Sequence, residues 1–184
     1  MTIPNDPSFD ETAIVNRIKN LWMQLELARI TGDLEPLKPY FSTHLYSVEN
    51  NIMRDDQRAN RLRHAIRPAI LQSRLTYEGV NRNQEILVCH MLTRTRPVEI
   101  RRSSGKTVSG EEETFWREEW TLSRPAGTVT PVDGSPVSVN CPGCGAPLSL
   151  YKSAKCPFCG YLVPVPDFTW TIDRIERQRE NNIG

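Results

Sequence analysis

Apolar residues recur at helical spacing in the first part of the chain. Between residues 10 and 32 they fall three or four positions apart and form a stripe made of Ile14, Ile18, Leu21, Leu25 and Ala28, widened by Val15 and Trp22. Asp10 can cap the start of this segment, and Gly32 can end it because glycine adopts positive φ without strain. The pattern predicts a long helix between Asp10 and Gly32, preceded by an extended lead-in over residues 1–9.

Two shorter helices are expected next. Residues 33–36 begin with aspartate and end with proline, which is typical of the first turn of a short helix. Ser42 or Thr43 can cap a third helix, which should end near Ala65 because Pro68 disfavours helical backbone at the residue before it. The expected inner face of this third helix consists of Leu45, Val48 and Ile52.

The pattern then changes to strands. Four segments are rich in β-branched and aromatic residues and contain alternating positions, and turns are expected between them at residues 81–83 and 103–110. Helices followed by a run of antiparallel strands predict an α+β domain over residues 10–124. The four segments are 69–80, 85–96, 97–102 and 114–123.

The last of these segments shows the alternation most clearly. Trp116, Trp120 and Leu122 share one parity, whereas Arg117 and Glu119 share the other. Successive side chains of a strand point to opposite faces of the sheet. This strand should therefore have one buried face and one wet face.

The C-terminal part of the chain divides into a linker, a small module and a return segment. Residues 125–140 hold three prolines and two glycines and predict a linker. A module follows at 141–163, and 164–184 contain a last strand and a polar tail, with Arg174–Gly184 expected to fray. We expect Trp170 to pack on the α+β domain or on the small module and to make the two move together, because an exposed ring of its size leaves a large apolar area in water.

The module carries two cysteine pairs. Its sequence runs Cys141-Pro-Gly-Cys144-Gly and, after ten residues, Cys156-Pro-Phe-Cys159-Gly. This spacing lets both sulfurs of a pair reach one ion, and four thiolates close a tetrahedral zinc site that has no position for water or substrate. The module has few apolar residues, so the metal should supply its folding free energy, on the order of 10 kcal/mol or more. We predict one structural zinc ion in a zinc ribbon, with iron as the alternative metal.

Charge and composition set the expected surroundings. The chain has 23 Lys and Arg against 22 Asp and Glu, so no net field attracts nucleic acid or lipid. No stretch approaches the ~20 apolar residues of a membrane-spanning helix, and the first residues lack the basic and apolar regions of a signal peptide. Paired cysteines also fit a metal site in a reducing compartment. We expect a cytoplasmic protein.

Two basic segments stand out against this neutral background. Residues 54–67 contain five arginines and two aspartates, a local charge of +3, and a second cluster consists of Arg94, Arg96, Arg101 and Arg102. Such clusters can bind the phosphates of lipid or RNA. The competing interpretation is a solvated face neutralised by Asp55, Asp56 and the acidic residues 111–113. The candidate anionic-surface residues are Arg54, Arg58, Arg61, Arg63 and Arg67, with the first three on one helical face.

No set of residues indicates catalysis. Cys89 and His90 lie inside a predicted strand, where a buried thiol and a core histidine are expected rather than a reactive pair. We find no nucleophile, base and orienting acid that suggest a triad. The sequence therefore predicts a protein that is not an enzyme.

Two stretches resemble a known family. The first runs from Asn5-Asp-Pro-Ser-Phe9 through Leu21-Trp-Met-Gln-Leu25 to residues 33–46, and the second is Phe115-Trp-Arg-Glu-Glu-Trp-Thr-Leu-Ser-Arg124. Together they resemble the Tim44-like domain, named for the motor-scaffold subunit of the mitochondrial inner-membrane translocase. Bacterial members carry similar inserted knuckles followed by a tryptophan strand like residues 168–172. The mitochondrial proteins lack these knuckles.

The resemblance implies a fold and a class of function. It implies a cone-like domain, in which helices pack on a curved antiparallel sheet around a pocket, and a binding module without catalytic residues. Its mitochondrial relatives act as scaffolds at a cardiolipin-rich membrane. We therefore expect an interaction or scaffold module with a protein partner and weak contact with anionic lipid, peripheral to the inner face of the membrane. The alternatives are a small-molecule or enzymatic pocket in the cone, and a ribosome- or RNA-associated zinc-ribbon protein.

Against the last alternative, the ribbon has few basic residues and no aromatic–basic stacking surface, so we expect no nucleic-acid partner.

Overall fold

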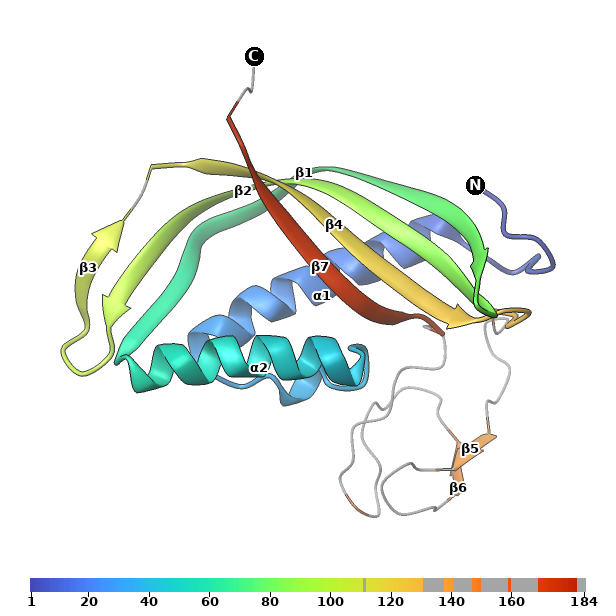
Figure 1. The fold of residues 1–184 in the computed structure, drawn as a ribbon, viewed down its shortest axis with the longest axis horizontal. Coiled ribbons are helices and arrows are strands. Elements are labelled where there is room, and N and C mark those ends of the chain that lie inside the picture. Colours follow the sequence, from blue (N-terminus) through green and yellow to red (C-terminus); the bar gives the residue numbers. More distant parts are fainter. Residues whose placement is uncertain (111, 131–137, 141–146, 150–158, 160–168, 182–184) are drawn as a thin grey trace.

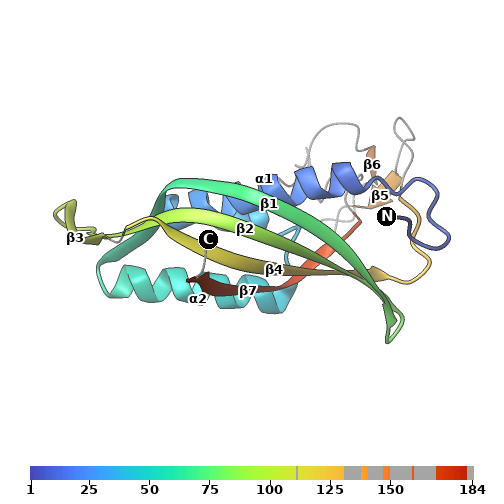
Figure 2. The ribbon, with the colours of Figure 1, turned by 90° about the horizontal axis from the view of Figure 1, so that it is seen from above.

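The protein consists of two helices packed against one face of a large antiparallel sheet, which arches over them in Figure 1. The computed structural model describes residues 1–110, 112–130, 138–140, 147–149, 159 and 169–181. Helices come first and strands follow, which confirms the predicted α+β class. Seen from above in Figure 2, both helices lie on the same face, the first near one edge of the sheet and the second near the opposite edge.

The first helix, α1 (Glu11–Thr31), forms where the sequence predicts it. The Asp10 carboxylate accepts hydrogen bonds from the backbone amides of Thr12 and Ala13, at 2.8 and 3.1 Å. Gly32 ends the helix at a φ of 77° and donates its amide to the Ala28 carbonyl. The predicted stripe is buried and points at the sheet, together with one carboxylate, Glu26.

The third predicted helix is shorter than expected. After the 3₁₀ turn η1 (Glu35–Leu37), Ser42 caps α2 (Thr43–Arg58), and the chain leaves the helix at Asn60 with a φ of 55°. The prediction that this helix continues to Ala65 was wrong. Asparagine tolerates positive φ, and pairing with the neighbouring strand takes over the backbone hydrogen bonds from Arg61 onward.

The inner face of α2 also differs from the prediction. Val48 and Ile52 are 39% and 43% exposed. The helix instead turns Leu45, Glu49, Met53 and Asp56 inward. Two of these four residues are acidic and meet arginines on other elements, which the hydrophobic pattern could not reveal.

Five strands build the sheet, in the order β1, β2, β4 and β7, with β3 paired to the end of β2. The two segments expected at 85–96 and 97–102 form one continuous strand. The predicted turn at 81–83 is confirmed, with Arg82 and Asn83 at positive φ. The strands are β1 (Arg61–Asn81), β2 (Gln84–Arg101), β3 (Lys106–Gly110), β4 (Thr114–Pro125) and β7 (Thr171–Glu180), and a separate pair consists of β5 (Ser138–Asn140) and β6 (Pro147–Ser149).

The polar tail does not fray over its described length. Strand β7 runs antiparallel to β4 as far as the pair Phe115 and Glu180, and its inner side carries Ile175 and Arg177. The expectation for 174–184 was therefore wrong for residues 174–180. Alternating charged residues looked like solvated tail, but one face of this strand packs on the tryptophans of β4.

Strand β1 lies at the edge of the sheet and is interrupted. Its pairing with β2 shifts register between Ile66 and Ala69, where Arg67 has a φ of 51° and is followed by Pro68. An extra residue at positive φ bends a strand, and proline has no amide to donate. The edge strand is thereby divided into two shorter paired segments.

One buried arginine connects distant parts of the chain. Arg124, 1% exposed, donates from Nε to Glu85 at 2.6 Å and from Nη2 to Asp6 at 2.8 Å. Its Nη1 lies 3.3 Å from the hydroxyls of both Thr130 and Thr169. The guanidinium therefore binds the N-terminal lead-in, the start of β2, the segment after β4 and the segment before β7 at one point.

Trp170 completes this cluster. Its ring is 2% exposed and lies against the Arg124 guanidinium, with 4.3 Å between the guanidinium carbon and the ring centroid. Of the two predicted neighbours, the α+β domain and the small module, the ring packs on the α+β domain. The ring shields the ion pairs from water, and the buried cation–π contact adds to their stability.

Asp6 should stabilise the fold in a pH-dependent way. Burial raises the pKa of its carboxyl, but hydrogen bonds from the Thr130 hydroxyl, Arg124 and the Thr130 amide outweigh it and hold the pKa below the ordinary 3.8. We expect Asp6→Asn to lower the free energy of unfolding by about 2 kcal/mol at neutral pH. A depressed pKa gives stability that is present above 3.8 and lost as pH falls through the lower, folded-state value. The difference between parent and variant should therefore shrink in acid.

Urea denaturation followed by tryptophan fluorescence, from neutral pH to about pH 3, measures this difference. Asp55→Asn is the control, because Asp55 is exposed and pairs only with Arg58 among the described residues. It should change stability by less than about 0.5 kcal/mol. A parent–variant difference that stays constant with pH would contradict the role assigned to the Asp6 carboxylate.

Candidate functional site

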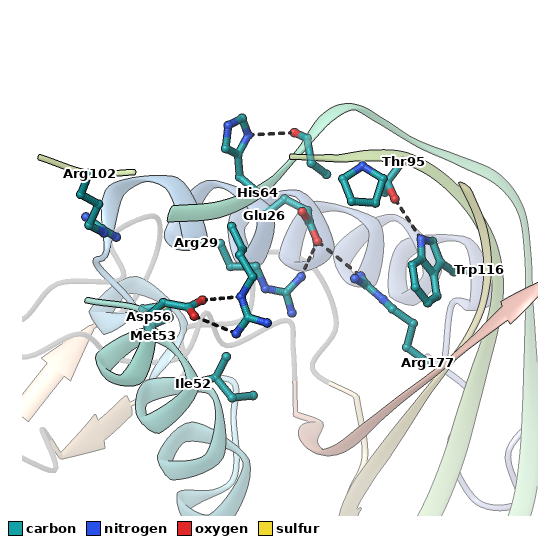
Figure 3. Close-up of a pocket in the computed structure, with 13 residues that line it drawn as sticks. Glu26, Arg29, Ile52, Met53, Asp56, His64, Thr95, Arg102, Trp116 and Arg177 are labelled. Carbon is teal, nitrogen blue, oxygen red and sulfur yellow. Dashed lines mark hydrogen bonds and ion pairs between the residues drawn. The ribbon is translucent and has the colours of Figure 1, made fainter. Parts of the chain in front are cut away.

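The candidate site is a cavity of about 390 Å³ between the two helices and the inner face of the sheet (Figure 3). Residues from α1, α2 and three strands that are neighbours in the sheet meet there, with Arg177 added by β7. The lining combines arginines, acidic residues and apolar side chains. The lining consists of Glu26, Arg29, Ile52, Met53, Asp56, Arg63, His64, Ala65, Thr95, Pro97, Arg102, Trp116 and Arg177.

A fully buried carboxylate, Glu118, lies beneath this cavity. It sits on the inward parity of β4 beside Trp120 and has no exposed surface. Trp22 donates its indole N–H to both carboxylate oxygens at 3.1 Å, and the Thr93 hydroxyl donates at 2.7 Å. Arg177 adds an ion pair at 2.9 Å. A buried charge requires such partners, and here they come from α1, β2 and β7.

Two further carboxylates, Glu26 and Glu49, pair with arginines beside the cavity. Glu26 binds both Arg29 and Arg177, the latter at 3.3 Å, and Glu49 from α2 lies 3.4 Å from Arg29. Burial lowers the pKa of the Arg29 guanidinium, but Glu26, Glu49 and Glu118 raise it by more, so the group is a permanent cation. These ion pairs connect α1 and α2 to the last strand.

The outer wall of the cavity holds a third charged group. Asp56 accepts a bidentate pair from Arg63, at 2.9 Å from Nε and 2.8 Å from Nη2, and a further bond from Arg61 at 3.0 Å. The hydrogen bond to Asp56 raises the pKa of Arg63. Arg102 reaches the cavity from the turn after β2 and donates to the Arg61 carbonyl at 2.7 Å.

The charged groups of the described lining are paired with one another or with neighbouring groups. Both acidic residues that line the cavity, Glu26 and Asp56, are paired with arginines. Its histidine, His64, has its Nδ1 near the Ala65 carbonyl. The lining holds four arginines and two acids, and Glu49 and Glu118 behind it also pair with Arg29 and Arg177. Among the described residues, Arg102 is the lining arginine without a carboxylate partner, so it is the donor left for an acidic group.

The structure separates the five arginines predicted to share a basic surface. Arg54 and Arg58 lie on α2, whereas Arg61, Arg63 and Arg67 lie on β1, so the predicted single helical face for Arg54, Arg58 and Arg61 was wrong. Arg58 pairs with Asp55 at 3.2 Å, and Arg61 and Arg63 pair with Asp56. These contacts match the competing interpretation of local neutralisation.

The strand residues Cys89 and His90 lie on opposite faces of the sheet. Cys89 is fully buried, and burial raises the pKa of its thiol to about 12, as expected for an inert core thiol. His90 is not a core residue: its ring lies on the outer face, with Nδ1 3.1 Å from Glu119. The prediction for His90 was wrong because adjacent strand positions alternate between faces.

The four predicted zinc ligands lie mostly outside the described residues. Of these four, only Cys159 is described, and no group of three or more potential ligands occurs in the part of the chain that the structure describes. The prediction of a zinc site by Cys141, Cys144, Cys156 and Cys159 is therefore not tested.

Sequence reasoning missed the buried ionic groups around the cavity. The sequence analysis did not single out Glu118, and it placed Arg177 in the polar tail expected to fray. The signal for Glu118 was its parity, since it lies on the same face as Trp116 and Trp120.

Comparison with known families gives one match. The model of the Tim44-like domain matches residues 3–133, which extends from the lead-in past the end of β4. No curated protein matches the chain. None of the helices in the described parts of the chain is long and apolar enough to cross a membrane.

The buried Glu118 provides a test of the site's construction. In Glu118→Gln an amide nitrogen replaces one oxygen, so a donor would face Trp22, Thr93 or Arg177, and Arg177 would lose one of its two buried counter-charges. We expect a loss of about 3–5 kcal/mol in the free energy of unfolding. The matched control is Glu119→Gln, the next residue on the same strand but half-exposed, which should cost less than about 0.5 kcal/mol. Equal urea midpoints for the two variants would contradict this assignment.

Proposed function

The chain belongs to the family of Tim44-like domains, and from this premise we propose that it is a non-enzymatic interaction module that serves as a scaffold at the periphery of a membrane or a protein-transport assembly. The family match spans more than half of the chain. The proposed location is the cytoplasm, at the inner face of the membrane. The proposed partner is a protein, with anionic lipid as a weak second contact.

The ion pairs of the cavity carry this proposal. Catalysis by acid or base requires a group that can exchange a proton near neutral pH. Glu26 and Asp56 each lie at hydrogen-bond distance from arginines, and Arg29 remains a cation. The described lining is thus suited to hold charge in place and not to transfer protons.

A small acidic ligand in the cavity is the second candidate function. It is favoured by the volume of about 390 Å³, within the range of small-molecule sites, and by four arginines in the lining. Trp116 and Met53 supply apolar wall beside them. A carboxylate or phosphate group attached to a short apolar body would match this mixture.

One substitution separates the two functions. Ala65→Leu adds side-chain volume to the cavity wall without changing charge. For a scaffold, we expect pull-downs with parent and variant, with and without anionic liposomes, to recover the same partner. A thermal shift of several degrees by carboxylate or phosphate ligands, seen in the parent and abolished in Ala65→Leu, would support the ligand cavity instead. Loss of the partner in the variant would contradict a scaffold that binds outside the cavity.

We also propose that the module at 141–163 is a zinc ribbon held by Cys141, Cys144, Cys156 and Cys159. Strand β5 ends at Asn140 and pairs with β6, which begins at Pro147. The paired residues Asn140 and Pro147 flank the first cysteine pair, so both ends of that segment lie together, as at a hairpin turn. Zinc bound there would supply folding energy to the module and no chemistry.

The expected zinc content is one equivalent. Elemental analysis of protein purified without added metal should show zinc. A strong chelator should remove the metal, and added zinc should restore it. In Cys144→Ser/Cys159→Ser zinc should fall to background, whereas Cys89→Ser, which changes a cysteine of the sheet, should retain it. Iron in place of zinc, or no bound metal, would overturn the proposal.

A further inference from the structure

Three basic residues form a row across three strands at one end of the sheet. In the strand register, Arg61 of β1 lies opposite Arg101 of β2, and Arg101 lies opposite Lys106 of β3. Residues directly opposite one another share a face of the sheet, so the three side chains leave the same face side by side. Arg102 follows Arg101 and is held against the Arg61 backbone at 2.7 Å.

The positive charge of this row is not neutralised locally. Arg61 pairs with Asp56, but no described carboxylate lies within ion-pair distance of Arg101, Arg102 or Lys106. Glu99 is the acid on the same face one pair further along, opposite Arg63. Like charges directly opposite in a sheet destabilise it. The row therefore concentrates positive charge on one face of the sheet at a cost in stability.

The turn beside this row is held in place by hydrogen bonds and projects from the end of the sheet. Asn60 at the end of α2 and Ser103 in the turn bind each other twice, at 2.7 and 3.0 Å, and the Arg102 amide donates to the Asn60 carbonyl. Figure 1 shows the β2–β3 turn projecting beyond the end of α2. Residues 101–110 are exposed throughout, including Val108 at 53%.

We propose that this end of the sheet, the basic tip formed by Arg61, Arg101, Arg102 and Lys106, is the surface through which the protein contacts an anionic lipid bilayer. The proposal rests on the membrane-peripheral part of the proposed function and assigns it a surface. A protruding tip can touch a flat layer of phosphate groups, and the exposed Val108 beside it fits the bilayer interface. A single-stranded nucleic acid would call for aromatic stacking residues, and 98–110 contain none.

Co-sedimentation with vesicles tests the tip. One set of vesicles contains phosphatidylcholine alone, and the other contains phosphatidylglycerol as well. Each basic group near an anionic surface strengthens partitioning about fivefold, so Arg101→Gln/Arg102→Gln/Lys106→Gln should weaken binding about a hundredfold. The single variant Arg101→Gln, which changes a fully solvent-facing side chain, should weaken it about fivefold. Binding should require phosphatidylglycerol and fall with added salt.

A matched control removes the same charge elsewhere. Arg74→Gln/Arg82→Asn/Arg174→Gln changes three arginines outside the tip, and it should bind within about twofold of the parent. The tip variant should unfold at a urea concentration close to that of the parent, because relieved repulsion offsets the lost hydrogen bond from Arg102 to the Arg61 carbonyl. A similar midpoint excludes misfolding as the cause of lost binding.

The possible results separate the tip from the wider function. Equal binding by the tip variant, the control and the parent would overturn the tip and leave the membrane-peripheral function standing. A parent that does not sediment with phosphatidylglycerol vesicles would overturn both. Binding of single-stranded RNA that depends on the tip, without vesicle binding, would replace the bilayer by nucleic acid.

Discussion

The structure depends on the burial of one guanidinium. Arg124 lies at the end of β4, and its nitrogen atoms bind groups from the lead-in, from β2 and from both sides of residues 131–168. A buried cation is costly unless its donors find acceptors, so the burial of Arg124 requires these segments to meet at one point. The domain is built from two separate stretches of the chain. Strand β7 lies beyond the family match over 3–133, yet it completes the sheet by pairing with β4.

A similar rule shapes the concave face. Glu118 is buried on the inner side of β4, Glu26 on α1 and Glu49 on α2, and arginines from α1 and β7 bridge them. Helices and sheet are thus joined by alternating charges where a domain of this kind could have used apolar contacts. Such contacts demand defined geometry, since each unpaired partner would be left charged in a dry environment. The cavity follows as the space that these directed contacts leave open.

Sequence reasoning succeeded where local chemistry decides the outcome. The cap at Asp10, the stop at Gly32 and the turn at residues 81–83 depend on nearby residues only, and the packing of Trp170 follows from its size. It failed where distant segments decide. Arg61 belongs to a strand because it pairs with β2, and Glu118 is buried because donors from α1 and β7 bind it. The cavity was expected only through the family resemblance, because its lining comes from six elements.

The interruption in β1 affects how readily copies of the protein associate through their sheet edges. An edge strand of 21 residues exposes a long row of backbone groups that another extended chain could join. At Arg67 and Pro68 the strand bulges and loses a donor, so no uninterrupted ladder of hydrogen bonds can form along its whole length. Edge-to-edge stacking of copies is thereby discouraged during synthesis and at high concentration. The bulge thus works against aggregation, while β1 stays paired with β2 on both sides of it.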